Sequence, residues 1–296
     1  MPESQPRRWA FGACLALVLA GLTGPAAQAA QVVRLAPLPL ENHKIVQEQF
    51  QGLTDYLEET AGVEIEWVRF TDNASIVAAF CAGQVDLAYL GPMPYVILSR
   101  DCPQARPLTC FRDANGAAAC TCSLVVFGDS GLTLEGLKGV SFGLTQPYST
   151  CGYLASSEML ATLGLALEGD GNRLSYAGSH SEAALGVARG KYDVAGIKTS
   201  IAARYSHLNL NVIATSSPYP GFSVVANAAT LDPVTLDRLQ QALLRLDPVA
   251  HPDLAEHMKT WGDQIRNGTV PAEQCDYSGV AAALERLPWP IPTGEP

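Results

Sequence analysis

The residues best suited to chemistry form the run 145–153, which lies between a predicted strand and a predicted helix. Ser149 and Thr150 are good helix caps, so their hydroxyls and the free N–H groups of the following turn would converge on one point. A helix N-terminus carries about half a positive charge, and each hydrogen bond to an anion is worth roughly 1.5–3 kcal/mol. The pattern is typical of a tetrahedral oxyanion site, and an ordinary helix cap without a ligand is the alternative.

Catalysis is a weaker hypothesis for the same residues. Ser149 or Cys151 would be the nucleophile and His180 the base, but no acidic residue stands in a context that would orient the histidine. The run around Ser149 also differs from the Gly-x-Ser-x-Gly turn that exposes a nucleophile. We therefore expect a binding protein and no enzyme. The five histidines show no metal-ligand spacing with cysteine or acid, so we expect neither a metal site nor a cofactor.

The elements around this run alternate between strand and helix patterns. The first unit reads as strand, helix, strand, helix, strand over residues 32–35, 44–60, 63–67, 75–82 and 85–90. The second unit has predicted strands at 124–127, 140–144, 174–177, 192–195 and 211–215, with helices at 152–163 and 181–190. Such alternation predicts an α/β fold with mainly parallel sheets. A strand at 222–226 and a helix at 235–246 follow.

The N-terminus reads as an export signal over residues 1–30. Two arginines precede an apolar run at 13–22, and small residues form a cleavage pattern at 27–29. Cys14 precedes the apolar run instead of closing it, so we expect a soluble periplasmic protein rather than a lipoprotein. The chain of 296 residues has a formal net charge of −10. Without clustered basic residues, nucleic-acid binding is disfavoured.

The length after signal removal favours two lobes. A loop rich in Cys, Pro, Asp and Gly at 101–118 is the candidate boundary, which predicts one lobe from 31–118 plus 222–296 and another from 119–221. Seven cysteines follow the signal, at positions 81, 102, 110, 120, 122, 151 and 275. Most should pair in an oxidising compartment, and the odd number leaves at least one thiol over.

Several segments together resemble one known family. They are Gln84–Pro92, the strand from Ser123 to Ser130, the Ser149-Thr150-x-Gly152 cap, Gly178-Ser179-His180 at a helix start, and Ser217–Gly221. In this order they resemble the periplasmic substrate-binding proteins of phosphonate, phosphite and phosphate ABC transporters. The resemblance implies the type II periplasmic binding protein fold, in which two lobes enclose a ligand cleft, and a membrane permease as partner.

The resemblance also implies site residues. It assigns ligand contacts to Ser149, Thr150, Cys151, Gly152 and His180, and it aligns Cys120 and Asn73 with two further contact positions. For His180, a solvated helix cap is the alternative interpretation.

Departures from the family pattern bear on the ligand. Relatives that bind aminoalkylphosphonates hold the ammonium with acidic side chains, and here Ser200 and Phe222 stand at those positions. An unpaired buried ammonium is costly. This favours a compact oxyanion without a cationic tail, such as phosphite, phosphate, a small phosphonate, arsenate or arsenite.

Two cysteines leave a second hypothesis open. Cys151 replaces a family hydroxyl, and thiols are poor donors to oxyanions but strong ligands for thiophilic centres such as trivalent arsenic. The resemblance extends to arsenite-binding sensor proteins that signal to a membrane histidine kinase, so the chain could be such a sensor. Alternatively, Cys120 or Cys122 forms a disulfide with Cys151, or Cys120 pairs elsewhere.

Overall fold

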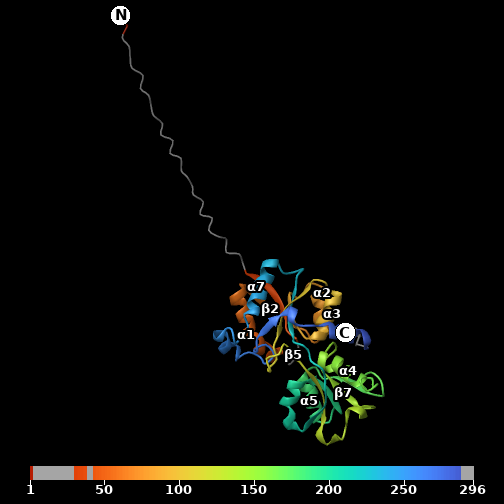
Figure 1. The fold of residues 1–296 in the computed structure, drawn as a ribbon. Coiled ribbons are helices and arrows are strands. Elements are labelled where there is room, and N and C mark those ends of the chain that lie inside the picture. Colours follow the sequence, from red (N-terminus) through yellow and green to blue (C-terminus); the bar gives the residue numbers. More distant parts are fainter. Residues whose placement is uncertain (3–29, 39–42, 288–296) are drawn as a thin grey trace.

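The structure, a computed structural model, describes residues 1–2, 30–38 and 43–287. Two α/β lobes lie one above the other in Figure 1. Apart from residues 1, 2 and 30, the predicted export signal lies outside the described residues. Within the described residues, no helix has the length and apolar character needed to cross a membrane.

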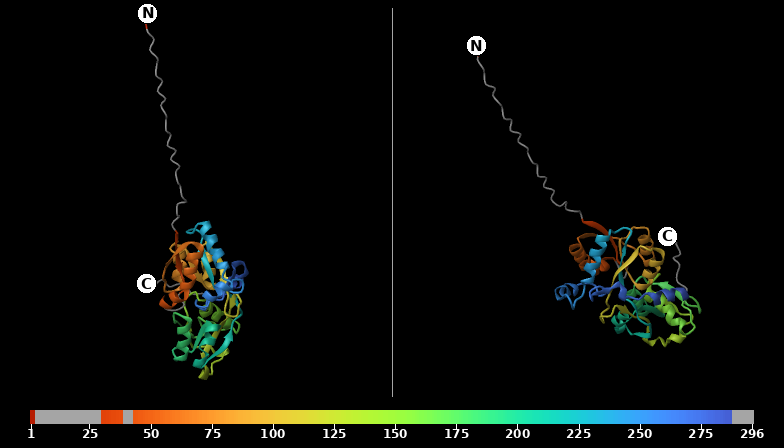
Figure 2. Two further views of the ribbon diagram at one scale, coloured as in Figure 1. Left: turned by 90° about the vertical axis from the view of Figure 1, so that its left-hand side faces the viewer. Right: turned by 45° about the horizontal axis from the view of Figure 1, so that its top comes forward.

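The first lobe contains a six-stranded sheet. Its strand order is β13-β4-β12-β3-β1-β2. In that order the strands are Thr269–Pro271, Ala105–Phe111, Ser223–Asn227, Leu87–Leu90, Gln31–Ala36 and Val63–Trp67. The helices in this part of the chain are α1 (His43–Ala61), α2 (Asn73–Cys81), α3 (Pro92–Asp101), α7 (Pro233–Leu244), α8 (Pro252–Met258) and α9 (Ser278–Arg286). Figure 2 shows the C-terminal part of the chain, in blue, rejoining the N-terminal part.

The second lobe contains a five-stranded sheet. Its strand order is β10-β6-β9-β7-β8. In that order the strands are Leu210–Thr215, Cys122–Phe127, Val194–Lys198, Ser141–Leu144 and Arg173–Tyr176. The helices here are the π-helical turn η3 (Thr150–Ala155), α4 (Ser156–Ala161), α5 (His180–Ala188) and α6 (Thr199–Arg204), with short 3-10 turns η1 (Gly128–Ser130), η2 (Leu134–Gly136) and η4 (Ser206–Leu208).

A short two-stranded ribbon joins the lobes. It pairs β5 (Ala119–Cys120) with β11 (Tyr219–Pro220) in antiparallel fashion, and β5 lies between the two lobes in Figure 1. Every strand of the five-stranded sheet comes from the chain between these two crossings. We therefore propose lobe boundaries at 118/119 and 221/222, as expected from the sequence.

Hydrophobic periodicity explains the first elements. The spacing of Val46, Phe50, Leu53 and Leu57 places them on one face of α1, and all four are buried. In β2 the apolar residues Val63 and Ile65 face the core, while Glu64 and Glu66, which alternate with them, are exposed. Both elements thus follow the periods of 3.6 and 2 that their sequences predict.

The segment 92–118 differs from its sequence prediction. The residues after Gly91-Pro92 form α3, which begins with proline at its first turn, a position that needs no N–H donor. The predicted loop 101–118 is wrong over β4, because the sheet buries residues 108–111 between β12 and β13. Pro107 has no N–H to donate to a neighbouring strand. It is tolerated in β4 because the pairing with β12 shifts register between Val224 and Val225.

The prediction of mainly parallel sheets is only partly right, because both sheets are mixed. Strands β1, β2 and β3 are parallel, as are β7, β8 and β9. The strands that follow the two crossings between the lobes are antiparallel to their neighbours: β12 is antiparallel to β3, and β6 is antiparallel to β9. Strand β9 also runs three residues beyond its predicted end, to Lys198.

In the part of the chain that the structure describes, three disulfides account for six of the seven cysteines. They join Cys81 to Cys102, Cys110 to Cys275 and Cys122 to Cys151. Cys120 is the free and buried thiol that the odd number required. The Cys122–Cys151 bond ties β6 to the first turn of η3 and so restrains the segment that carries the predicted cap.

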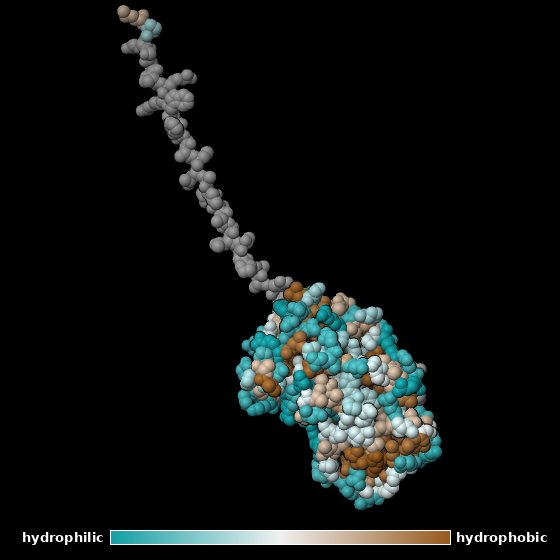
Figure 3. Space-filling view, in the orientation of Figure 1, coloured by the Kyte–Doolittle hydropathy of each residue, from teal (hydrophilic) through white to brown (hydrophobic). Residues whose placement is uncertain are grey.

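The surface is mostly polar in the view of Figure 3, where apolar residues gather in one area of the lower lobe. Large apolar side chains exposed in the second lobe are Phe127, Leu163, Tyr176 and Val212.

Replacing Gly196 with alanine should destabilise the second lobe. A Cβ there would lie 2.1 Å from Oγ of Ser156 and 3.0 Å from the carbonyl oxygens of Cys151 and Gly152. The crowding should lower the free energy of unfolding by about 1–3 kcal/mol, measured by urea denaturation. The control Gly279→Ala has no atom within 4 Å of the new Cβ, so it should be neutral or stabilising by about 0.5–1 kcal/mol. Equal stability of the two variants would contradict the close packing.

Candidate ligand-binding site

A small cavity lies between the two lobes. Its volume is about 30 Å³, and on this measure one water needs roughly 10–15 Å³. Six of the seven predicted site residues line it: Asn73, Cys120, Ser149, Thr150, Cys151 and His180. Asn73 belongs to the first lobe and Ser149, Thr150 and His180 to the second, so the cavity lies at the lobe junction. Gly152 is absent from this wall.

The turn η3 begins at the cavity with the predicted cap. Ser149 is the N-cap, and its Oγ accepts a hydrogen bond from the N–H of Gly152 at 3.0 Å. The N–H groups of Thr150 and Cys151, which lie between Ser149 and Gly152, have no acceptor within the helix. Gly152 allows η3 to pack closely against Thr145, because a Cβ on Gly152 would lie 2.6 Å from Oγ1 of Thr145 and 2.7 Å from the backbone nitrogen of Thr145. A π-helical first turn is a frequent feature of functional sites.

Thr150 connects the two lobes. Its Oγ1 accepts a hydrogen bond of 3.0 Å from the backbone N–H of Met93, in the first turn of α3. A Cβ on Gly91, the N-cap of α3, would be in ordinary contact with Oγ1 of Thr150 at 3.5 Å and would crowd the Phe222 ring at 3.2 Å. The first lobe therefore closes directly onto the cap of the second.

His180 begins α5 and is held as a neutral imidazole. Its Nδ1 accepts a 3.2 Å hydrogen bond from the backbone N–H of Lys198. Burial, helped by the charge of Lys198, lowers the pKa of His180 from 6.5 to about 4. Because Nδ1 is the acceptor, the proton of the neutral ring lies on Nε2. His180 is thus a hydrogen-bond donor at neutral pH.

Ser149, Thr150 and His180 share one arrangement. Each uses an acceptor atom to bind a backbone N–H of the protein. The O–H of each hydroxyl and the Nε2–H of the imidazole remain as donors. Among the described residues that line the cavity, no side chain is acidic. The wall is suited to a ligand that accepts hydrogen bonds and carries negative charge.

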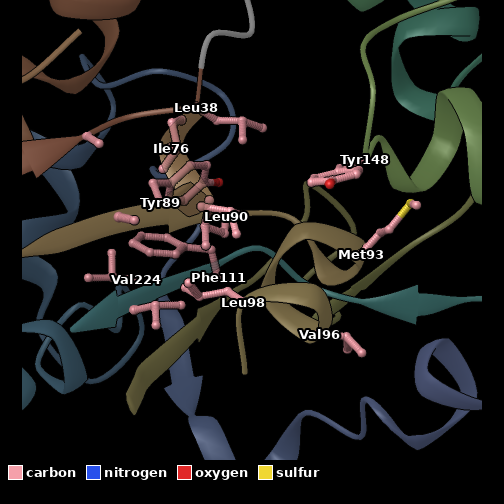
Figure 4. Packing of buried hydrophobic residues seen from close by; sticks show 14 of the residues in the cluster. Leu38, Ile76, Tyr89, Leu90, Met93, Val96, Leu98, Phe111, Tyr148 and Val224 are labelled. Carbon is pink, nitrogen blue, oxygen red and sulfur yellow. The ribbon is translucent and has the colours of Figure 1, made fainter. Parts of the chain in front are cut away.

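Tyr148 covers the cavity from the second lobe. Its backbone φ is 60°, a left-handed conformation that a bulky residue seldom adopts and that is often found at ligand sites. The ring is buried, and in Figure 4 it points from its loop towards the residues of the first lobe, among them Leu38. Burial raises the pKa of its hydroxyl. The strained backbone places an aromatic ring where the lobes meet.

Asn73 is the first residue of α2 and makes a second contact between the lobes. Its Nδ2 donates to the carbonyl oxygen of Pro147 at 3.3 Å. Its Oδ1 is buried and has no hydrogen-bond partner among the described residues. Asn73 therefore supplies an acceptor beside the cavity.

The thiol role predicted for Cys151 is wrong, because its sulfur is bonded to Cys122. The disulfide alternative for Cys122 is confirmed. Cys120 keeps its thiol, but burial raises the pKa of that thiol to about 11. A neutral thiol is a poor nucleophile and metal ligand, so the cavity lacks the pair of reactive thiols that the arsenite hypothesis considered.

Sequence reasoning assigned no ligand contact to several residues of the wall. Leu38, Pro94 and Lys198 had not been singled out at all. The segments singled out for chemistry or for the family resemblance contained Gly91, Pro92, Thr145, Gln146, Tyr148, Gly178 and Ser179, and Phe222 had been noted only as a departure from the family. Lys198 was missed because its strand was predicted to end at residue 195. The position of Lys198 could have been recognised from the sequence, because ligands bind outside the carboxyl ends of strands in such sheets.

Comparison with known proteins identifies the family and the fold. The sequence model of the family described as "ABC transporter, phosphonate, periplasmic substrate-binding protein" matches residues 35–277. The chain is 27% identical to the phosphate-import protein PhnD of Mycolicibacterium smegmatis, over 90% of this chain and 92% of that protein.

Two solved structures have the same fold. PhnD1 of Prochlorococcus marinus in complex with methylphosphonate has a TM-score of 0.72 at 18% identity, covering 86% of this chain and 98% of that one. A binding protein component of a phosphonate ABC transporter from Pseudomonas aeruginosa has a TM-score of 0.72 at 19% identity, covering 86% and 85%. No comparison supports an arsenite sensor.

Replacing His180 with asparagine should flatten the pH dependence of stability. Between pH 6.5 and about 4 the unfolded chain binds a proton that the folded His180 excludes, so the free energy of unfolding falls as the pH falls through this window. Asparagine keeps an acceptor for the Lys198 N–H but does not titrate. The slope should be shallower by up to about 1.4 kcal/mol per pH unit, measured by urea denaturation at pH 4.5, 5.5 and 6.5. Identical slopes for the two proteins would refute the neutral imidazole.

Proposed function

This chain belongs to the phosphonate-binding family of periplasmic substrate-binding proteins of ABC transporters, and on that premise we propose that its cavity binds a compact tetrahedral phosphorus oxyanion. Phosphate, phosphite and methylphosphonate are the candidates. The observation that carries this proposal is the set of donors at Ser149, Thr150 and His180, each already oriented by a backbone N–H group.

The donor arrangement favours an anion over a neutral ligand. Preoriented donors need not reorganise when the ligand binds, and hydrogen bonds to a charged acceptor are the strong ones. Lys198 adds a cation to the same wall. An ammonium-bearing group would meet donors and a like charge there, so the cavity itself disfavours a cationic ligand.

The size of the cavity and its acceptor favour particular oxyanions. A volume of about 30 Å³ suits a group no larger than a few heavy atoms. The unpartnered Oδ1 of Asn73 could accept a hydrogen bond from an oxyanion that keeps a proton, such as monohydrogen phosphate. Sulfate has no proton at neutral pH, so it should bind more weakly. Two relatives agree in ligand class, because one is a phosphate-import protein and another was solved with methylphosphonate.

Ligand binding should favour the closed arrangement of the lobes. The bonds from Met93 to Thr150 and from Asn73 to Pro147 join the lobes, and the cavity walls come from both sides. A ligand that contacts both walls binds the closed state better than the open one and shifts the population accordingly. The closed state would then be the form presented to the transporter's membrane permease. We further propose that residues 1–30 direct export to the periplasm, where the family members work.

Thermal stability in the presence of candidate ligands tests the binding proposal. Phosphate, phosphite or methylphosphonate at 100 times its dissociation constant should add about 2.7 kcal/mol to the stability, and sulfate should add less. Thr150→Val should weaken binding about 10- to 100-fold by calorimetry, because it removes one hydrogen bond to an anion.

The matched control is Thr162→Val, at the C-terminal end of α4. Its hydroxyl bonds to the carbonyl oxygen of Met159, and it does not line the cavity. Binding should therefore be unchanged in this variant. If no phosphorus oxyanion binds, or if Thr150→Val binds as well as the wild type, the proposal fails.

Small-angle scattering tests the closure. The radius of gyration should decrease when the binding ligand of the panel saturates the protein, because the open population is removed. The same ligand should cause less compaction at equal concentration with Thr150→Val, which lacks the Oγ1 bonded to Met93. An unchanged radius at saturation, for a wild-type protein that starts open, would contradict ligand-driven closure.

A further inference from the structure

A second and larger cavity adjoins the first. Its volume is about 240 Å³. Three residues belong to the walls of both cavities: His180, Lys198 and Phe222. The smaller cavity, with the donors of η3, is the inner chamber, and the larger one is the vestibule. A substituent on a ligand in the inner chamber could extend past these three residues into the vestibule.

The charges around the vestibule favour an anion. Its described wall carries three cations, Lys198, Arg204 and Arg266, and two carboxylates, Asp113 and Asp263. With His180 neutral, the balance is one positive charge. Both carboxylates are already engaged, which leaves neither of them as a free partner for a cationic ligand.

The pairing of these charges is uneven. Asp263 is shared by two cations, since it forms ion pairs with Arg204 and, at 2.9 Å, with Arg266. Asp113 pairs with Nζ of Lys198 at 3.1 Å and also accepts the N–H of Ala114 at 2.9 Å. The side chains of Arg204, Arg266 and Asp263 are 43–54% exposed, so water screens this group. One carboxylate faces two guanidinium groups there, which leaves one positive charge in excess.

Lys198 stands between the two chambers. It is the last residue of β9, and its Nζ lies 5.9 Å from the centre of the Phe222 ring. The side chains of Lys198 and Asp113 are only 15% and 19% exposed, so water screens the pair less than a surface pair. A second negative group on the ligand would meet this ammonium at the entrance to the vestibule.

We propose that the vestibule is a subsite for an anionic substituent, so that the preferred ligand class is a phosphonate or phosphate ester with a second negative group such as a carboxylate. Lys198 is the specificity-determining residue. This inference rests on the proposed function, because the phosphoryl group of such a ligand would occupy the inner chamber. A substituent with an ammonium group is disfavoured, since it would face Lys198 and two engaged carboxylates.

The inference is tested with three ligands that differ in the substituent. Methylphosphonate has no second charge, phosphonoacetate has a carboxylate, and 2-aminoethylphosphonate has an ammonium. By calorimetry at fixed pH and low salt, phosphonoacetate should bind at least about tenfold more tightly than methylphosphonate, which is the value of one charged hydrogen bond. The compound with the ammonium should bind more weakly than methylphosphonate.

Variants of the ion pair should move the phosphonoacetate-to-methylphosphonate affinity ratio in opposite directions. Lys198→Gln should bring the ratio to about one, and Lys198→Arg should restore a preference for the carboxylate. Asp113→Asn should raise the ratio, because it releases Lys198 from its partner. Circular dichroism and urea denaturation establish that each variant is folded, and the ratio within one variant corrects for any general loss of affinity.

The possible outcomes separate the two proposals. If methylphosphonate, phosphate and phosphite all fail to bind the wild-type protein, the proposed function fails. If they bind but phosphonoacetate binds no more tightly than methylphosphonate, or the ammonium compound binds best, the anionic subsite is wrong. A ratio that does not respond to Lys198→Gln would show that another residue sets the preference and would overturn the role of Lys198.

Discussion

The hydrogen bond from the N–H of Met93 to Oγ1 of Thr150 is the interaction on which the site depends. It joins the first turn of α3 to the first turn of η3 and therefore holds one lobe against the other. It also uses the acceptor capacity of the threonine, so that the hydroxyl proton is directed elsewhere. Lobe closure and the orientation of a ligand donor are thus set by the same contact.

The scaffold around this contact is restrained by covalent and steric means. The Cys122–Cys151 disulfide ties η3 to strand β6, which lies between β10 and β9 in its sheet. Gly152 and Gly196 let backbone segments approach at distances that a Cβ would prevent. Tyr148 accepts a left-handed backbone conformation just before the cap. A rigid turn of this kind lets donors keep their positions without losing entropy when a ligand binds.

Two neighbouring basic side chains, one neutral and one charged, have different roles at the cleft. His180 is kept neutral by burial and by the N–H that it accepts from Lys198, so it contributes a directional donor. Lys198 contributes a full charge, held between Asp113 and the ring of Phe222. Direction at the inner chamber and charge at its entrance are separate means of selecting an anion. Lys198, the last residue of β9, takes part in both, because its N–H orients His180 of α5 and its ammonium group supplies the charge.

The sequence alone determined the alternating strands and helices from β1 to β3 and from β6 to α5, the apolar faces of α1 and β2, the Ser149 cap and the resemblance to the family, because these depend on residues close together in the chain. The odd cysteine count likewise predicted a leftover thiol. Only the tertiary structure decided that Cys122 pairs with Cys151, that residues 105–111 form a strand, and that Lys198 and Phe222 lie beside the cap. These outcomes depend on distances between segments far apart in sequence, which local periodicity and capping patterns do not encode.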